Sequence, residues 1–181
     1  MNENTRTSDE GFSAADKDFI LKTAKEVRNE LLEAEREQGG EDNNLMGKCI
    51  QASDRIADIL QQEGYVCESI QCWCLYEDWE SCPEVCYEEH WVNKITKGKD
   101  TLYVDATCSQ FQWAFFEQLP DIYMGKQLPN FFLEKEPDLA FMKVIGWAHY
   151  YEYGEGSPNF DFGNYAVKPD HKNNMKTYEE R

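Results

Sequence analysis

Long apolar runs are absent from this chain of 181 residues. No stretch approaches the roughly 20 consecutive apolar residues that a membrane-spanning helix needs, so the sequence predicts no transmembrane segment. The first six residues, Met1 to Arg6, are polar, and no apolar segment follows them. They therefore do not resemble a secretory signal. We expect a cytoplasmic protein that does not act on membranes.

Positive charge is also scarce. The chain has 18 Lys and Arg residues against 35 Asp and Glu residues, which gives a formal net charge of -17. A surface this acidic repels phosphate backbones, so we expect no nucleic-acid partner. A basic patch on a protein partner remains compatible with it.

Internal repeats and low-complexity blocks are missing as well, and the length favours one domain. Apolar residues make up 41% of the chain, which is enough for a sizeable core. We expect a flexible N-terminus over residues 1–12, a single domain over residues 13–158 and a polar tail over residues 159–181. The sequence does not indicate an oligomeric state.

The order of the expected elements predicts the fold class. Ser13 and Asp16 form a capping pattern, and a stripe of apolar residues at helical spacing follows it up to the glycines at 39–40. The remaining elements are a second helix over 46–62, a strand over 65–76, an acidic loop over 77–87, a hairpin over 89–111, a helical segment over 112–119 and a helix or strand over 139–153. Helices that precede strands in this way are typical of an α+β fold with an antiparallel sheet.

The hairpin carries the first functional signal. Lys97 to Asp100 is a turn signal between β-branched and aromatic residues, with His90 before it and Asp105 after it. Side chains alternate between the faces of a strand. An even-numbered loop therefore places His90 and Asp105 on one face, directly opposite or one diagonal apart. A carboxylate that holds an imidazole is half of a catalytic triad.

Cys49 is the candidate nucleophile. It lies in the expected first turn of the second helix, where unpaired N–H groups and the helix dipole favour a thiolate. Gly47, two residues earlier, allows a substrate to approach the backbone closely. A cysteine, a histidine and an aspartate in these positions suit acyl transfer.

The motifs G-x-C, H-W-V and Y-V-D-A-T-x-x-Q-F resemble the papain-like and transglutaminase-like cysteine superfamily. The resemblance is closest to the bacterial papain-fold toxins and effector deamidases, and it covers residues 45–111. It implies a Cys-bearing helix packed on an antiparallel sheet, with Cys49 as nucleophile, His90 as base and Asp105 as orienting acid. Two departures leave the subfamily open, because Trp91 follows His90 directly and Ile50 follows Cys49.

The activities that the resemblance implies are peptide hydrolysis, glutamine deamidation and glutamine–amine crosslinking. The sequence does not choose among them. We expect a protein or peptide substrate, no cofactor and no metal. Candidate oxyanion-stabilising or substrate-binding residues are Asn43, Asn44, Trp91 and Gln110.

The cysteines support an alternative of another class, a non-catalytic protein-binding module with a structural zinc. Seven cysteines are many for a reducing cytosol, and five of them lie between Cys67 and Cys86, close to His90. Zinc needs four nitrogen or sulfur ligands, yet no C-x2-C pair is present. The triad and the zinc site compete for His90.

Overall fold

The first helix follows its sequence signals closely. A computed structural model describes residues 11–40, 45–78, 84–115, 118–129 and 131–135. In it α1 spans Ala14–Glu37, and the predicted capping box is present, because Ser13 Oγ accepts from Asp16 N at 3.1 Å and Asp16 Oδ2 accepts from Ser13 N at 2.7 Å. The apolar stripe of α1 is buried; its members are Ile20, Ala24, Val27 and Leu31.

The second helix begins later than the sequence suggested. α2 spans Cys49–Gln62, three residues after the expected start at Met46. Leu45 and Gly47 have φ angles of 57° and 74°. Residues in the left-handed region do not continue a right-handed helix, so this segment turns instead and Cys49 becomes the first residue of α2.

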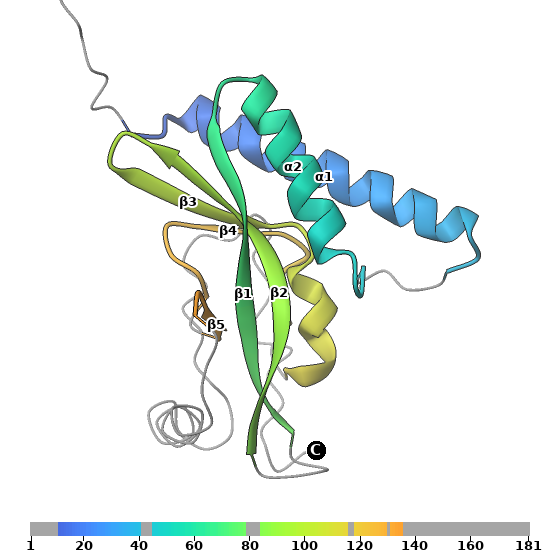
Figure 1. Ribbon diagram of the computed structural model, residues 1–181. Coiled ribbons are helices and arrows are strands. Elements are labelled where there is room, and N and C mark those ends of the chain that lie inside the picture. Colours follow the sequence, from blue (N-terminus) through green and yellow to red (C-terminus); the bar gives the residue numbers. More distant parts are fainter. Residues whose placement is uncertain (1–10, 41–44, 79–83, 116–117, 130, 136–181) are drawn as a thin grey trace, which may run out of the picture.

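The strands form one antiparallel sheet in the order β4-β3-β2-β1-β5. The bounds are Val66–Asp78 for β1, Glu84–Lys97 for β2, Asp100–Asp105 for β3, Tyr123–Gly125 for β4 and Phe132–Leu133 for β5. The tight turn predicted at Lys97 to Asp100 is present, and it has two residues, since Lys97 pairs with Asp100. Figure 1 shows how strongly β1 and β2 twist across each other.

Two predictions, one about a loop and one about a helix, differ from the structure. Most of the expected acidic loop over 77–87 belongs to strands, because the β1–β2 ladder extends until Asp78 pairs with Glu84. Backbone hydrogen bonds pair strands whatever their side chains are. An acidic strand therefore lacks the apolar alternation by which a strand is predicted from sequence. The helix expected over 112–119 is instead a 3₁₀ helix, η1, at Cys108–Ala114, and it ends where Phe115 adopts an extended conformation.

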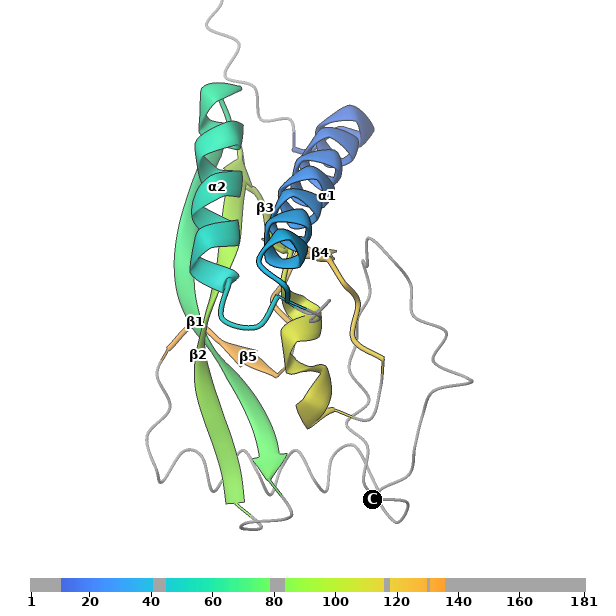
Figure 2. The same cartoon turned by 90° about the vertical axis from the view of Figure 1, so that its right-hand side faces the viewer.

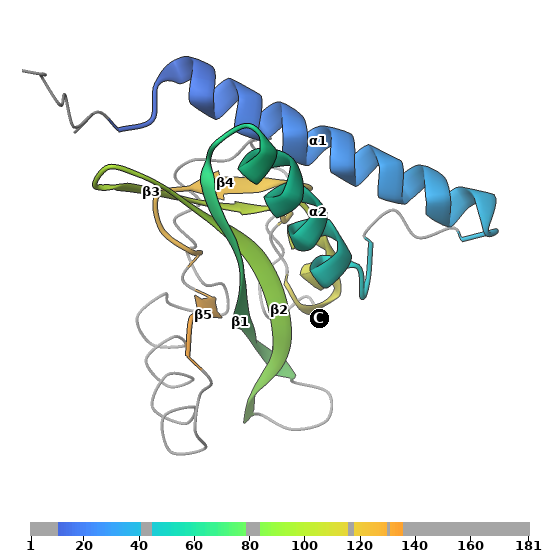
Figure 3. The same cartoon turned by 45° about the horizontal axis from the view of Figure 1, so that its top comes forward.

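The helices and the sheet enclose two buried clusters. α1 and α2 lie side by side over the sheet (Figures 2 and 3), and the first cluster fills the space between them and the strands. The second cluster is aromatic and sulfur-rich; its buried members are Cys72, Cys74, Val92, Cys108, Phe111, Phe115, Leu119, Tyr123, Phe131 and Phe132. The α+β class is thus confirmed, and His90 and Asp105 lie next to the second cluster.

Several predicted features fall outside the described residues. These are most of the flexible N-terminus, the acidic segment at 41–44, the element over 139–153 and the tail over 159–181. Among the helices that the structure does describe, none is long and apolar enough to cross a bilayer.

Candidate active site

A tight turn presents Cys49 at the start of α2. Lys48 N donates to Leu45 O at 3.0 Å, and the Leu45 side chain is buried in the core below. A non-glycine residue in the left-handed region is strained and persists only where its surroundings hold it. Lys48 also forms an ion pair with Glu35 at 2.7 Å, which ties the turn to the end of α1. The backbone before Cys49 is therefore firmly positioned.

The first turn of α2 has the polarity that a thiolate needs. The N-cap residue, Lys48, makes no side-chain cap hydrogen bond, and the first turn contains no acidic residue. The first N–H groups of a helix lack partners within the helix, and they carry the positive end of its dipole. The backbone at Cys49 therefore favours an anionic sulfur.

Cys49 differs from its neighbouring thiols in accessibility. Cys49 as a residue has a relative exposure of 9%, whereas Cys72, Cys74 and Cys108 are 0% exposed. Burial raises the pKa of each of these three thiols well above its ordinary value and raises the pKa of Cys67 to about 12. A buried neutral thiol is a poor nucleophile. Cys49 is thus the best-placed nucleophile among the five cysteines described.

The structure brings His90 and Asp105 together. In the register of β2 and β3, Asn93 pairs with Val104, which places Asp105 opposite Val92 and one diagonal from His90. His90 Nε2 lies 2.7 Å from Asp105 Oδ2, and both side chains are almost completely buried. This is the arrangement that the even-numbered loop predicted.

The Asp105 carboxylate is fixed at its second oxygen as well. Oδ1 accepts from Thr107 N at 2.8 Å and from Thr107 Oγ1 at 3.0 Å. Three donors therefore surround this carboxylate, which satisfies a buried charge and prevents it from rotating away from His90.

Aromatic rings and Asp105 together set the state of His90. Its ring packs against both Phe111 and Phe132, with centroids at 4.9 Å in each case. Burial by itself lowers the pKa of His90. The charge and hydrogen bond of Asp105, joined by a hydrogen bond and charge interaction with Cys49, outweigh burial and raise this pKa to about 9. Cys49, His90 and Asp105 thus form one interacting chain.

Gln110 extends this chain to the turn before Cys49. Its Nε2 lies 2.9 Å from His90 Nδ1 and 3.2 Å from Thr107 Oγ1, while its Oε1 accepts from Gly47 N at 3.3 Å. The side chain thus contacts the imidazole and the backbone beside the nucleophile at once.

The other predicted binding residues do not join this network. Asn43 and Asn44 lie outside the described residues. Trp91 follows His90 on β2, so its side chain leaves the opposite face of the strand, where it is half-buried. A substrate-binding role for these three residues stays a prediction.

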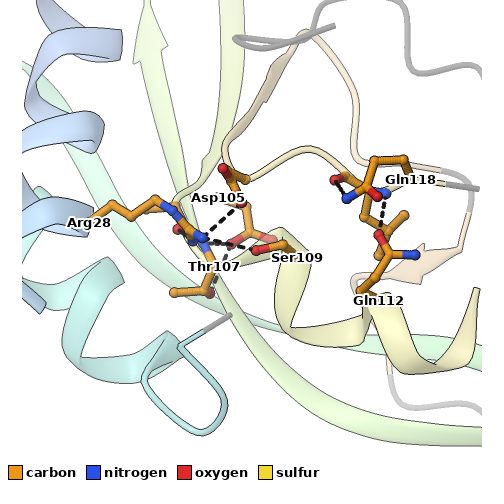
Figure 4. A network of polar contacts seen from close by, with 9 residues as sticks. Arg28, Asp105, Thr107, Ser109, Gln112 and Gln118 are labelled. Atoms are coloured by element: carbon orange, nitrogen blue, oxygen red, sulfur yellow. Dashed lines mark hydrogen bonds and ion pairs between the residues drawn. The ribbon is translucent and has the colours of Figure 1, made fainter. Parts of the chain in front are cut away.

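Sequence reasoning missed Arg28, which supports the site from α1. Its guanidinium is buried and donates to Ala106 O at 2.8 Å, to Ser109 Oγ at 3.1 Å and to Asp121 Oδ1 at 2.9 Å. Figure 4 shows Arg28 reaching from α1 to the segment that carries Thr107 and Ser109. The available signal was its position four residues after Ala24, at the edge of the buried stripe.

The described residues contain only part of the zinc cluster of the alternative hypothesis, and that hypothesis stays a prediction. Cys67 pairs with Ile95, five residues from His90 along β2, or about 16 Å at strand spacing. Both ring nitrogens of His90 already have partners. Within the described part of the chain, no group of three or more His, Cys, Asp or Glu side chains is arranged to hold a metal. Cys82 and the side chain of Cys86 lie outside that part.

A scan against protein-family models finds no match to this chain, and searches of the curated proteins and of the solved structures find none either. The chemistry of the site is therefore inferred from its own residues and contacts.

Proposed function

We propose that this protein is a cysteine-dependent acyl-transfer enzyme that acts on amides, with Cys49 as nucleophile, His90 as proton carrier and Asp105 as the group that orients His90. The observation that carries the proposal is the buried hydrogen bond between His90 Nε2 and Asp105 Oδ2, at 2.7 Å, in a site where the charge of Cys49 also acts on His90. A structural histidine needs no thiol at a helix start within its electrostatic reach.

The two nitrogens of His90 have separate roles in this mechanism. Nε2–H donates to Asp105, so Nδ1 takes the proton of the Cys49 thiol, in exchange for its contact with Gln110 Nε2, as the sulfur attacks the amide carbon. The C–N bond then breaks, and Nδ1–H returns that proton to the leaving nitrogen. A thioester on Cys49 remains, and water or an amine resolves it.

Backbone donors beside Cys49 suit the oxygen that becomes negative during the attack. The first N–H groups of α2 belong to the same turn as Cys49, and donors at such a place stabilise a tetrahedral intermediate. A cysteine helix packed on a sheet with histidine and aspartate is also the core that the papain-like and transglutaminase-like resemblance implies. We extend the proposal to that core.

Exposed apolar side chains around Cys49 support a protein or peptide substrate. Met46 and Ile50 flank the cysteine and are 59% and 51% exposed. Apolar side chains next to a nucleophile offer contact area to a peptide, which a small charged substrate would not use. Glutamine side chains and peptide bonds are therefore the amides to test first.

Cys49→Ala tests the proposal. We expect a complete loss of amide turnover with a folded protein, because the substitution removes the nucleophile and only a few buried atoms. Cys108→Ala serves as the control, since it removes a buried thiol that has no role in the proposed reaction. The measurement is ammonia or peptide release from a glutamine-containing protein substrate, with thermal unfolding to confirm the fold.

Thiol labelling tests the site without a known substrate. Mapped alkylation across pH should label Cys49 fast near pH 6, and His90→Ala should abolish that fast labelling. An ordinary thiol, with a pKa of about 8.5, reacts slowly there. Slow labelling of Cys49 at every pH, or turnover by Cys49→Ala, would refute the enzyme proposal.

A further inference from the structure

An exposed tryptophan lies one helical turn from the groups that contact His90. Trp113 on η1 is 49% exposed, whereas the first four residues of η1 are buried. A 3₁₀ helix has three residues per turn, so residues three apart share one face, about 6 Å from each other along the axis. Trp113 follows Gln110 by three residues, and Gln110 contacts both His90 and Gly47 N. The indole therefore lies on the face of η1 that is turned toward the candidate site.

Tyr76 connects this tryptophan to the sheet. The rings of Tyr76 and Trp113 meet edge to face, with centroids 4.9 Å apart. Tyr76 follows Cys72 by four residues on β1, and Cys72 is the cross-strand partner of His90. Because side chains alternate between the faces of a strand, an even spacing keeps Tyr76 on the face that carries His90. The aromatic pair and the histidine thus share one side of the sheet.

Glu88 brings a negative charge to the same place. It precedes His90 by two residues on β2, so it lies on the same face and about 7 Å away along the strand. The side chain is exposed, and its Oε1 accepts from Tyr76 Oη at 3.3 Å. An exposed indole and an exposed carboxylate therefore both contact Tyr76, next to the proposed catalytic histidine.

We propose that Trp113 and Glu88 form a subsite that binds an arginine or lysine side chain of the protein substrate. This inference rests on the proposed function and names the substrate class as a basic segment. The face of an indole attracts a cation, and the carboxylate of Glu88 pairs with it. The formal net charge of -17 also draws basic segments to the chain.

The spacing along η1 places this side chain near the reacting amide. An extended peptide advances about 3.3 Å per residue, so the turn of about 6 Å from Gln110 to Trp113 corresponds to about two residues. On the other side of Cys49, the exposed side chains of Met46 and Ile50 offer apolar contact. The substrate should therefore carry an apolar residue on one side of the amide and a basic residue on the other.

Alkylation of Cys49 by charged peptides tests the subsite in the full chain. The probes are chloroacetyl peptides in which zero, one or two glycines precede an arginine amide. The Cys49 thiolate displaces chloride and forms a C–S bond, so the rate reports how well a probe is held beside the sulfur. Matched probes carry citrulline, whose neutral urea has the shape of the guanidinium. A salt concentration of about 0.5 M screens the long-range field of the acidic chain.

We expect the arginine probe with the best spacer to label Cys49 about 5- to 10-fold faster than its citrulline counterpart. Glu88→Gln and Trp113→Leu should each reduce this ratio to about 2–3. Glu89→Gln is the matched control, because it removes the same charge from the next residue, which is exposed on the opposite face of β2. This control should keep the wild-type ratio.

The outcomes separate this inference from the proposed function. Equal rates for arginine and citrulline probes at every spacer length would overturn the subsite, and so would an equal decrease in Glu88→Gln and Glu89→Gln. A loss in Trp113→Leu that affects both probes alike, with no effect of Glu88→Gln, would assign the surface to an apolar side chain and also overturn it. Fast alkylation without preference leaves the enzyme proposal standing, whereas slow alkylation by every probe refutes that proposal and the subsite with it.

Discussion

At the scale of single residues, the site is a chain of buried polar groups in which each partner limits the next. Asp105 is held by Thr107 and holds His90, and Gln110 joins His90 to Gly47. Such a network loses more than one hydrogen bond when a member changes its donors and acceptors, because the remaining groups stay buried. Isosteric substitutions are therefore the informative ones.

Asp105→Asn should reduce turnover by at least about 10³-fold while the protein stays folded. The amide of Asn presents a donor to His90 Nε2, so the imidazole proton moves to Nδ1, where it can no longer accept from Cys49. Amide turnover measured against wild type is the readout. Asp54→Asn, on the exposed side of α2, is the matched control and should keep full activity. Retained activity in Asp105→Asn would contradict the role of the carboxylate.

At the scale of elements, two connections place the site: the turn before α2 and the contact of α1 with the segment after β3. The turn depends on left-handed backbone at Leu45 and Gly47. The second contact depends on Arg28, whose donors reach Ala106, Ser109 and Asp121. Each of these two connections can be tested by comparing its variant with a control variant elsewhere in the fold.

Gly47→Ala should lower the free energy of unfolding by about 1–2 kcal/mol, the usual cost of a side chain in the left-handed region. Gly39→Ala, at a φ of 82° after α1, is the control with the same backbone cost; a Cβ meets nothing within 4 Å at either position. Chemical denaturation should give similar losses for both. Only Gly47→Ala should slow the alkylation of Cys49, and equal labelling in the two variants would argue against the turn as a positioning device.

Arg28→Met should lower the free energy of unfolding by about 3 kcal/mol, because it leaves buried acceptors without a donor. The control is Arg55→Met, since Arg55 is more than half exposed and lies 3.9 Å from Glu30. Its loss should stay below about 0.5 kcal/mol, as is usual for exposed pairs. Urea denaturation compares the two, and equal small losses would show that Arg28 does not hold the segment after β3.

At the scale of the whole molecule, a helical layer and a twisted sheet bury charged and titratable groups in a strongly acidic chain. The formal net charge is -17, yet His90 is completely buried beside Asp105. The free energy of unfolding should therefore depend on pH, because the titration of this pair differs between the folded and the unfolded state.

We expect the free energy of unfolding to fall between about pH 6.5 and pH 9. The pKa of His90 is raised from 6.5 to about 9 on folding, so the folded state holds a proton that the unfolded state has lost in this window. The contribution is complete below pH 6.5, disappears as the pH passes 9, and is on the order of 3 kcal/mol. Denaturation across this pH range measures it. Asp105→Asn should flatten the slope, and an unchanged slope in that variant would assign it to another group.

The sequence by itself determined the local features. The capping box of α1, the tight turn after Lys97 and the placing of His90 and Asp105 on one strand face follow from short spacings and strand alternation. These depend on neighbours in the chain, so pattern alone suffices to predict them. The start of α2 at Cys49 was predicted only approximately, because the strain at Leu45 is stabilised by the core.

Only the tertiary structure decided what surrounds the pair. Arg28 is 78 residues from its acceptor at Ala106, and Gln110 is 63 residues from Gly47. The short strands β4 and β5 pair with β3 and β1 for the same kind of reason, through contacts between distant segments. Such contacts are set by how the layers pack, and packing energy between distant residues leaves no periodic trace in the sequence.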